Sequence, residues 1–112
     1  MIVVIALLAA ASQSMTCVPY VHGERELTLG AREYSGKRYS SAYRHYASGL
    51  KVIHPLAVES AGEILGLKDD SHFAEVVAED DARAGRYRTA AKILGRILTM
   101  RLQNIHEVHR CH

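Results

Sequence analysis

Apolar residues recur every three or four positions along most of the chain, which is the spacing of one face of an α-helix. In residues 24–35 this stripe holds Leu27, Ala31 and Tyr34. No stretch alternates strictly between apolar and polar residues, so no β-strand is predicted and the fold class is all-α. The same helical spacing continues over residues 39–52, 56–65, 71–84 and 87–108.

Helix-breaking residues separate these segments. Residues 18–23, with Pro19 and Gly23, predict an irregular lead-in, and Gly36-Lys37-Arg38 predicts a turn. His54-Pro55 should end the second helix, because proline lacks a backbone donor and disfavours helix in the residue before it. Gly66 and Gly85 mark two later helix ends, and the cluster Asp69-Asp70-Ser71 supplies N-cap residues.

The sequence pattern predicts that one helix-turn-helix unit occurs twice. Shifting the sequence by 48 positions aligns eight pairs of similar residues, including Arg38 with Arg86 and Tyr39 with Tyr87. The remaining pairs are Leu29 with Val77, Gly30 with Ala78, Ala42 with Ala90, Arg44 with Lys92, Tyr46 with Leu94 and Leu50 with Leu98.

At these positions the chain resembles the tetratricopeptide family, whose helical hairpins repeat every 34 residues. The family pattern is a large and then a small residue in the first helix, a Gly-x-Tyr turn, and small, aromatic and apolar positions in the second. The resemblance implies a short solenoid of antiparallel hairpins, with residues 56–65 as an inserted helix. The matching residues are Leu29, Gly30, Tyr39, Ala42, Tyr46 and Leu50, then Val77, Ala78, Gly85, Tyr87, Ala90, Leu94 and Leu98.

The resemblance also implies a function as a protein-interaction module. In this family the first helices of the units line a concave face that grips a peptide or helix, which points here to Arg32, Glu33, Asp80 and Asp81. Solenoids usually need about three repeats for independent stability, so a larger partner or a homo-oligomer is expected. A second candidate surface is the basic stripe of Arg88, Lys92 and Arg96, with Arg101 nearby. Such a stripe meets an acidic partner or an anionic membrane surface, or is simply the solvated side of an amphipathic helix.

The net charge and the N-terminal segment limit which partners and which cellular compartment are expected. A formal net charge of +2 is too small to indicate nucleic-acid binding. Met1 to Ala11 is apolar throughout, too short to span a bilayer, and like the core of a secretory signal except that no Lys or Arg precedes it. We therefore expect an export segment over residues 1–16 and one domain over residues 17–112, with a periplasmic or secreted location. If the segment is not an export signal, the protein is expected to be cytoplasmic. In either case no membrane association is expected beyond this segment.

The two cysteines, Cys17 and Cys111, lie at opposite ends of the domain. In an oxidising compartment they could pair, whereas in the cytosol both would be free thiols. The C-terminus also gathers His106, His109, Cys111 and His112, whose imidazole and thiolate groups suit zinc or copper. A small metal-binding protein is therefore the alternative function, and a solvated tail is the structural alternative.

Catalytic motifs are sparse. Glu59-Ser60 resembles the catalytic pair of lytic transglycosylases, but the glycine-rich and aromatic segments that complete such a site are absent from this sequence. No phosphate-cradling loop, nucleophile elbow or HExxH helix occurs. We predict a non-enzymatic protein without a cofactor.

Overall fold

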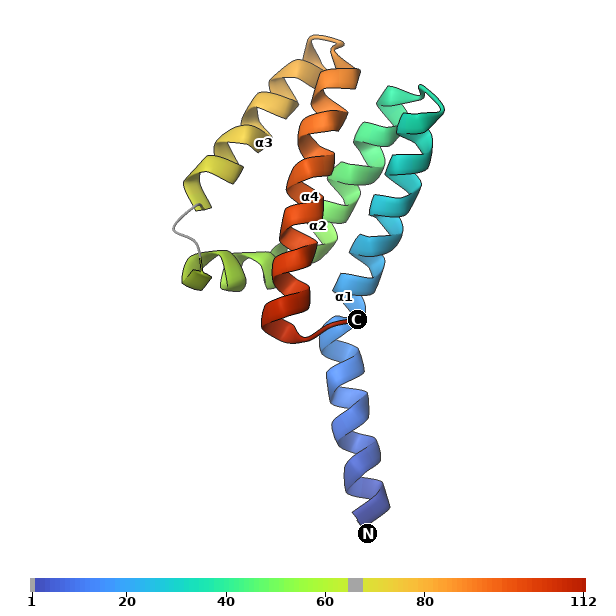
Figure 1. Cartoon of the computed structure of the whole chain (residues 1–112), viewed down its shortest axis with the longest axis vertical. Coiled ribbons are helices and arrows are strands. Elements are labelled where there is room, and N and C mark those ends of the chain that lie inside the picture. The colour runs from blue at the N-terminus through green and yellow to red at the C-terminus, as the bar shows by residue number, and fades with distance from the viewer. Residues whose placement is uncertain (1, 65–67) are drawn as a thin grey trace.

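A computed structural model describes the backbone of residues 2–64 and 68–112, and the side chains of residues 17–56 and 71–112. The described chain is helical apart from its turns and C-terminal end, which confirms the all-α class. Its four helices form two antiparallel hairpins (Figure 1). The helices are α1 (Ile2–Ser35), α2 (Tyr39–Ile64), α3 (Lys68–Arg83) and α4 (Tyr87–His109).

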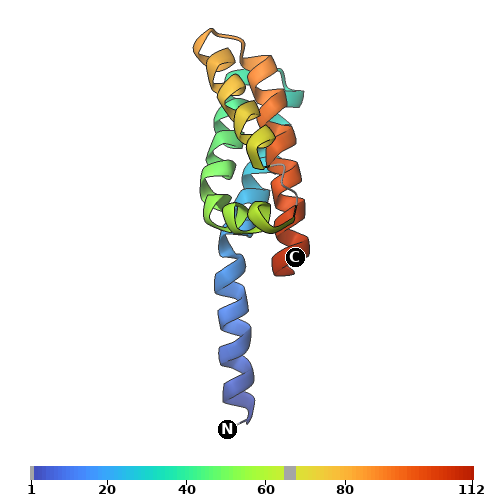
Figure 2. The same cartoon turned by 90° about the vertical axis from the view of Figure 1, so that its left-hand side faces the viewer.

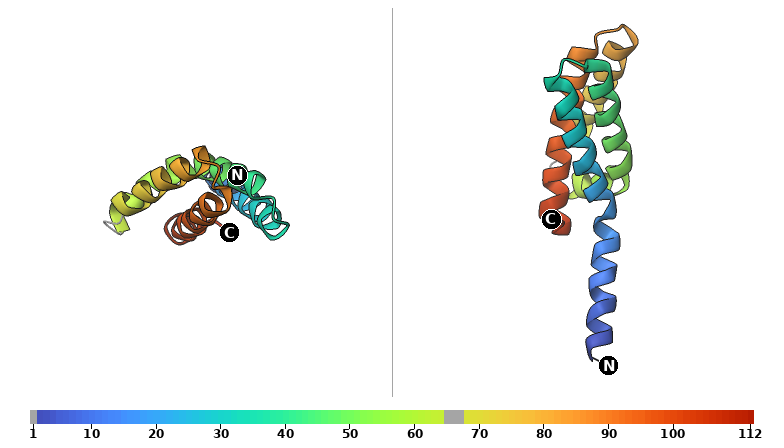
Figure 3. Two further views of the ribbon diagram at one scale, coloured as in Figure 1. Left: turned by 90° about the horizontal axis from the view of Figure 1, so that it is seen from above. Right: turned by 90° about the vertical axis from the view of Figure 1, so that its right-hand side faces the viewer.

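The second helices of the two hairpins, α2 and α4, pack against each other at the centre of the bundle. α1 contacts both of them, whereas α3 packs on α4 and touches α2 only slightly. α1 and α3 lie on opposite sides of α4 and share no contact among the described residues (Figures 1 and 3). Among the described residues the first helices therefore do not share the concave face that the family resemblance implied.

The turns of both hairpins have the same backbone hydrogen bonds, shifted by the 48 positions of the sequence repeat. In the first turn the Arg38 amide donates to the Glu33 carbonyl and the Lys37 amide to the Tyr34 carbonyl; in the second, Arg86, Asp81, Gly85 and Ala82 take these places. Each is a Schellman motif, which needs a left-handed residue after the helix. That residue is Lys37, with φ 63°, in one turn and Gly85, with φ 83°, in the other.

This difference predicts the effect of a glycine at the first turn. A side chain in the left-handed region costs roughly 1–2 kcal/mol, which glycine avoids. Lys37→Gly should therefore raise the free energy of unfolding by about 1 kcal/mol, and Gly85→Ala should lower it by a similar amount. Urea unfolding of both variants measures these changes. A less stable Lys37→Gly variant would contradict the strain assigned to Lys37.

The predicted lead-in at residues 18–23 is wrong, because α1 runs unbroken through Pro19 and Gly23. Tertiary contacts hold this segment helical: Tyr20 is buried in the core, and Cys17 is tied to the C-terminus. Gly23 lies where α1 approaches α2, and an added Cβ would stand 2.5 Å from Ile53 Cγ2. The N-terminal part of α1 extends well beyond the bundle (Figures 1 and 2).

The predicted helix break at His54-Pro55 is also wrong, since α2 continues through Pro55 to Ile64 and no separate inserted helix exists. Ile53 is fully buried and Leu56 packs against the core, so apolar contacts on both sides of the proline favour a continuous helix. Figure 1 shows its last turns bending away at the base of the bundle, as proline-containing helices do.

The predicted end of one helix at residues 65–66 and the predicted N-cap cluster at residues 69–71 lie before or at the start of α3. Leu65 and Gly66 lie outside the described residues, as do the side chains of Asp69 and Asp70. Ser71 is not an N-cap, because α3 begins at Lys68 and the Ser71 hydroxyl instead accepts a hydrogen bond from Arg101. The predicted starts at Tyr39 and Tyr87 are confirmed.

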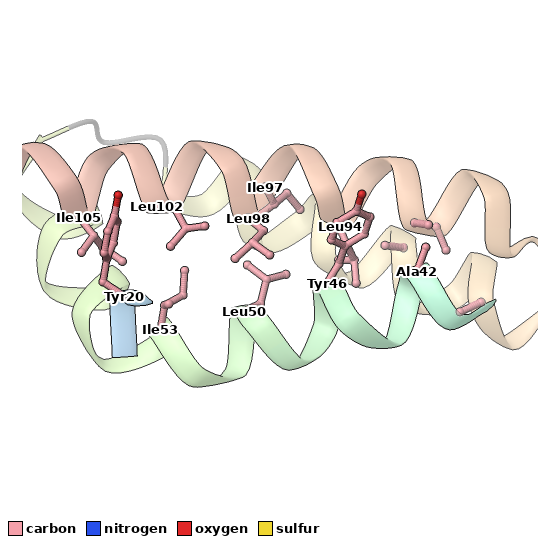
Figure 4. Close-up of a cluster of buried hydrophobic side chains, with 14 of the residues drawn as sticks. Tyr20, Ala42, Tyr46, Leu50, Ile53, Leu94, Ile97, Leu98, Leu102 and Ile105 are labelled. Atoms are coloured by element: carbon pink, nitrogen blue, oxygen red, sulfur yellow. The ribbon is translucent and has the colours of Figure 1, made fainter. Parts of the chain in front are cut away.

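Small residues allow the helices to approach closely, as the sequence predicted. Ala42, Ala78 and Ala90 have no exposed surface, and Gly30 lies directly against the Tyr46 ring. The core then runs along the interface of α2 and α4 (Figure 4). Its larger members are Tyr20, Tyr46, Leu50, Ile53, Leu94, Ile97, Leu98, Leu102 and Ile105.

Candidate functional site

An open groove of about 650 Å³ lies between α1 and α4. The two helices run side by side (Figure 3, right), and α2 runs along the other side of α1. The surface of the groove is mostly apolar, and its polar edge is formed by side chains of α4. It is lined by Leu27, Ala31, Tyr34, Tyr46, Ala91, Lys92, Gly95, Arg96, Thr99, Met100 and Gln103.

Tyr46 of α2 forms the floor of this groove. Its ring lies between two glycines: an added Cβ at Gly30 of α1 would collide with it, and one at Gly95 of α4 would stand 3.0 Å away. Only 6% of the Tyr46 residue is exposed. Figure 4 shows its side chain among the core residues between α2 and α4. Burial, and to a lesser extent the neighbouring Tyr34, raises the pKa of the Tyr46 phenol, so the floor stays uncharged at neutral pH.

Two cations of the predicted basic stripe form the polar edge. Lys92 and Arg96 are exposed, line the groove, and have no ion-pair partner among the described side chains. Arg88, the third member of the stripe, lies elsewhere: its guanidinium stands 5.8 Å from the centre of the Tyr39 ring at the α1–α2 turn. Arg101 does not extend the stripe, because it pairs with Glu75 of α3 at 2.9 Å.

The acidic residues that were predicted to contact a partner form ion pairs with other residues of the bundle. Glu33 pairs with Arg38, and Asp81 pairs with Arg86 at 2.9 Å, so each closes the turn of its own hairpin. Asp80 pairs with Arg83 at 3.3 Å on the α3 surface.

Arg32 remains exposed on α1 and makes no ion pair among the described residues. Because α1 and α3 are apart, Arg32 and Glu33 do not share a surface with Asp80 and Asp81.

The C-terminal residues are packed rather than gathered around a metal. Cys111 forms a disulfide with Cys17, so its sulfur is not a free thiolate ligand. His106 Nδ1 contacts the Cys111 carbonyl oxygen, and its ring stacks on Tyr20 at 6.3 Å. His109 Nε2 is buried without a hydrogen-bond partner, and His112 packs edge-on to His106. Within the described residues no three His, Cys, Asp or Glu side chains are placed to hold a metal ion.

Smaller hollows of about 320 and 450 Å³ lie between α2 and α3, and Tyr43 and Glu79 line both. Burial raises the pKa of the Tyr43 phenol, and Glu79 adds to the shift. Their surfaces are about half polar, and Glu79 already lies near Arg83, at 3.9 Å. These hollows therefore offer a partner less apolar surface than the α1–α4 groove does.

The sequence did not identify most of the groove. Its apolar residues come from three helices, and their spacing looks like ordinary core spacing in each helix alone. Apart from the basic stripe, the sequence signal is Gly95, which lies inside an amphipathic helical segment and so indicates a close approach to another group.

No catalytic group can be assigned from the described part of the chain. The side chains of Glu59 and Ser60 lie outside the described residues. Over residues 17–56 and 71–112, no helix has the length and apolarity needed to cross a membrane.

No protein-family model matches the chain. No curated protein and no solved structure matches it either.

Proposed function

We propose that this protein is a non-enzymatic interaction module of tetratricopeptide type, an adaptor, chaperone or assembly factor that binds another protein in the groove between α1 and α4. The observation that carries the proposal is an apolar surface left uncovered beside two unpaired cations, Lys92 and Arg96. An apolar groove is one of the recurring surfaces in which proteins bind an amphipathic helix of a partner. The matching Schellman turns and the buried alanines of both hairpins support the tetratricopeptide assignment.

We place this activity outside the cytoplasm. Two features support the location: the apolar segment at Met1 to Ala11 and the Cys17–Cys111 disulfide. Disulfides persist in oxidising compartments and are rare in reducing ones. The domain that binds the partner is therefore residues 17–112, behind an export segment over residues 1–16.

Site-specific photocrosslinking tests the proposed docking site. A benzophenone amino acid at Thr99, an exposed position inside the groove, should give a discrete crosslinked product with a separate protein in the native host. Thr89 is the matched control, because it is an exposed threonine of the same helix outside the groove. We expect no discrete product from Thr89.

The outcomes of this experiment are distinct. Equal products from Thr89 and Thr99, or none from either, would contradict docking in the groove. A product that contains only copies of this chain would replace the separate partner with a homo-oligomer.

A further inference from the structure

The shape of the groove favours an elongated partner over a small molecule. Small-molecule sites enclose most of the ligand surface. This groove is walled by two helices and open between them, so an enclosed ligand would stay largely in water. Along α4 the lining residues run from Ala91 to Gln103, which at 1.5 Å per residue is about 18 Å, or about three helical turns.

The apolar positions suit the side chains of a helix. The groove is lined by Leu27 and Tyr34 on α1 and by Met100 and the small Gly95 on α4, and the Tyr46 ring of α2 lies against Gly95. An amphipathic helix lying in such a groove places large apolar side chains at i, i+3 or i+4, and i+7 on its contact face. Three such side chains span about 10 Å along their helix, which fits within the ~18 Å of the groove.

The charges at the edge of the groove favour a partner helix whose polar side chains are acidic. Lys92 and Arg96 are one helical turn apart, about 6 Å along α4. Carboxylates at i and i+4 on a partner helix have the same spacing. None of the described acidic residues lines the groove, and Glu33, which precedes the lining residue Tyr34, is already paired with Arg38.

We infer that the groove binds an acidic amphipathic helix of about three turns, whose apolar face covers Tyr46 and whose carboxylates pair with Lys92 and Arg96. This inference rests on the proposed function, because it names the chemistry of the partner that the groove would bind. Opposite charges across an interface select the partner and speed its association.

Two designed peptides test the charge preference. Both carry leucine at i, i+3, i+4 and i+7; one has glutamate at its polar positions, and the other has lysine there. Fluorescence anisotropy with the full, disulfide-bonded chain should show binding of the acidic peptide at least tenfold tighter than that of the basic peptide. Adding salt should weaken the acidic complex.

Charge reversal at the edge provides the specific control. Lys92→Glu with Arg96→Glu should weaken the acidic peptide about tenfold and strengthen the basic one, which a folding defect could not produce. Arg25→Glu with Lys51→Glu makes the same change in net charge at exposed cations away from the groove and should leave the preference unchanged. Thr99→Trp should block binding of either peptide, whereas Thr89→Trp should not.

Equal affinity for the two peptides, no measurable binding of the acidic one, or an unchanged preference after charge reversal would overturn this inference. A Thr99 crosslink to a separate protein in any of these cases would leave the proposed function intact and show only that the partner is not an acidic helix. Tight binding of the acidic peptide without that crosslink would support the groove chemistry and contradict the proposed function.

Discussion

Replacing Cys17 and Cys111 with serine is expected to lower the free energy of unfolding by about 4–5 kcal/mol. The disulfide joins residues 94 positions apart, and cross-linking a loop of this length removes a large part of the entropy of the unfolded chain. It also holds the Cys111 end of the chain against α1, where 1% of Cys111 is exposed. For a domain of this size the melting temperature should fall by roughly 15 °C or more.

Circular dichroism melts of the double serine variant, with and without dithiothreitol, measure this effect. Reductant should lower the melting temperature of the parent protein to that of the variant and leave the variant itself unchanged. A parent protein that melts at the same temperature in both conditions would show that the bond does not stabilise the fold.

Tyr46→Ala should cost about 3–5 kcal/mol, the usual loss when a large core side chain is truncated. The cost should lie at the upper end, because Gly30 and Gly95 flank the ring and have no side chains to fill the space. The same ring is the floor of the groove, so removing it should also weaken peptide binding there.

Two variants separate packing from other effects in this prediction. Tyr46→Phe keeps the ring and should stay within about 1.5 kcal/mol of the parent protein in urea unfolding. Tyr87→Ala removes a tyrosine that is 37% exposed and should cost clearly less than Tyr46→Ala. Equal losses at Tyr46 and Tyr87 would mean that the ring is not a central packing element.

The two hairpins fill equivalent core positions with side chains of different size. At the position where the first unit sets the large Tyr46 against Gly30, the second unit has the smaller Leu94 and the larger Ala78. Both members of the second pair are buried. Close packing of interiors explains this exchange, since a larger side chain on one helix needs a smaller one on its neighbour.

Local features of the fold could be predicted from the sequence alone. The helix period, the turns at residues 36–38 and 84–86, and the starts at Tyr39 and Tyr87 follow from residues within one or two helical turns of each other. The hydrogen bonds of those turns join residues no more than five positions apart, so short sequence patterns determine them. Ala42 and Ala90 were predicted to be buried because the helical spacing places them on the apolar face.

Tertiary contacts decided the rest. Pro19 and Pro55 stay within helices because Tyr20, Ile53 and Leu56 pack into or against the core beside them, and local propensity cannot include that energy. The groove combines three helices, and the disulfide joins the two ends of the domain. Such features depend on which helices are neighbours in the folded protein. The packing of α2 against α4 determines that arrangement, and it does not exist before the chain has folded.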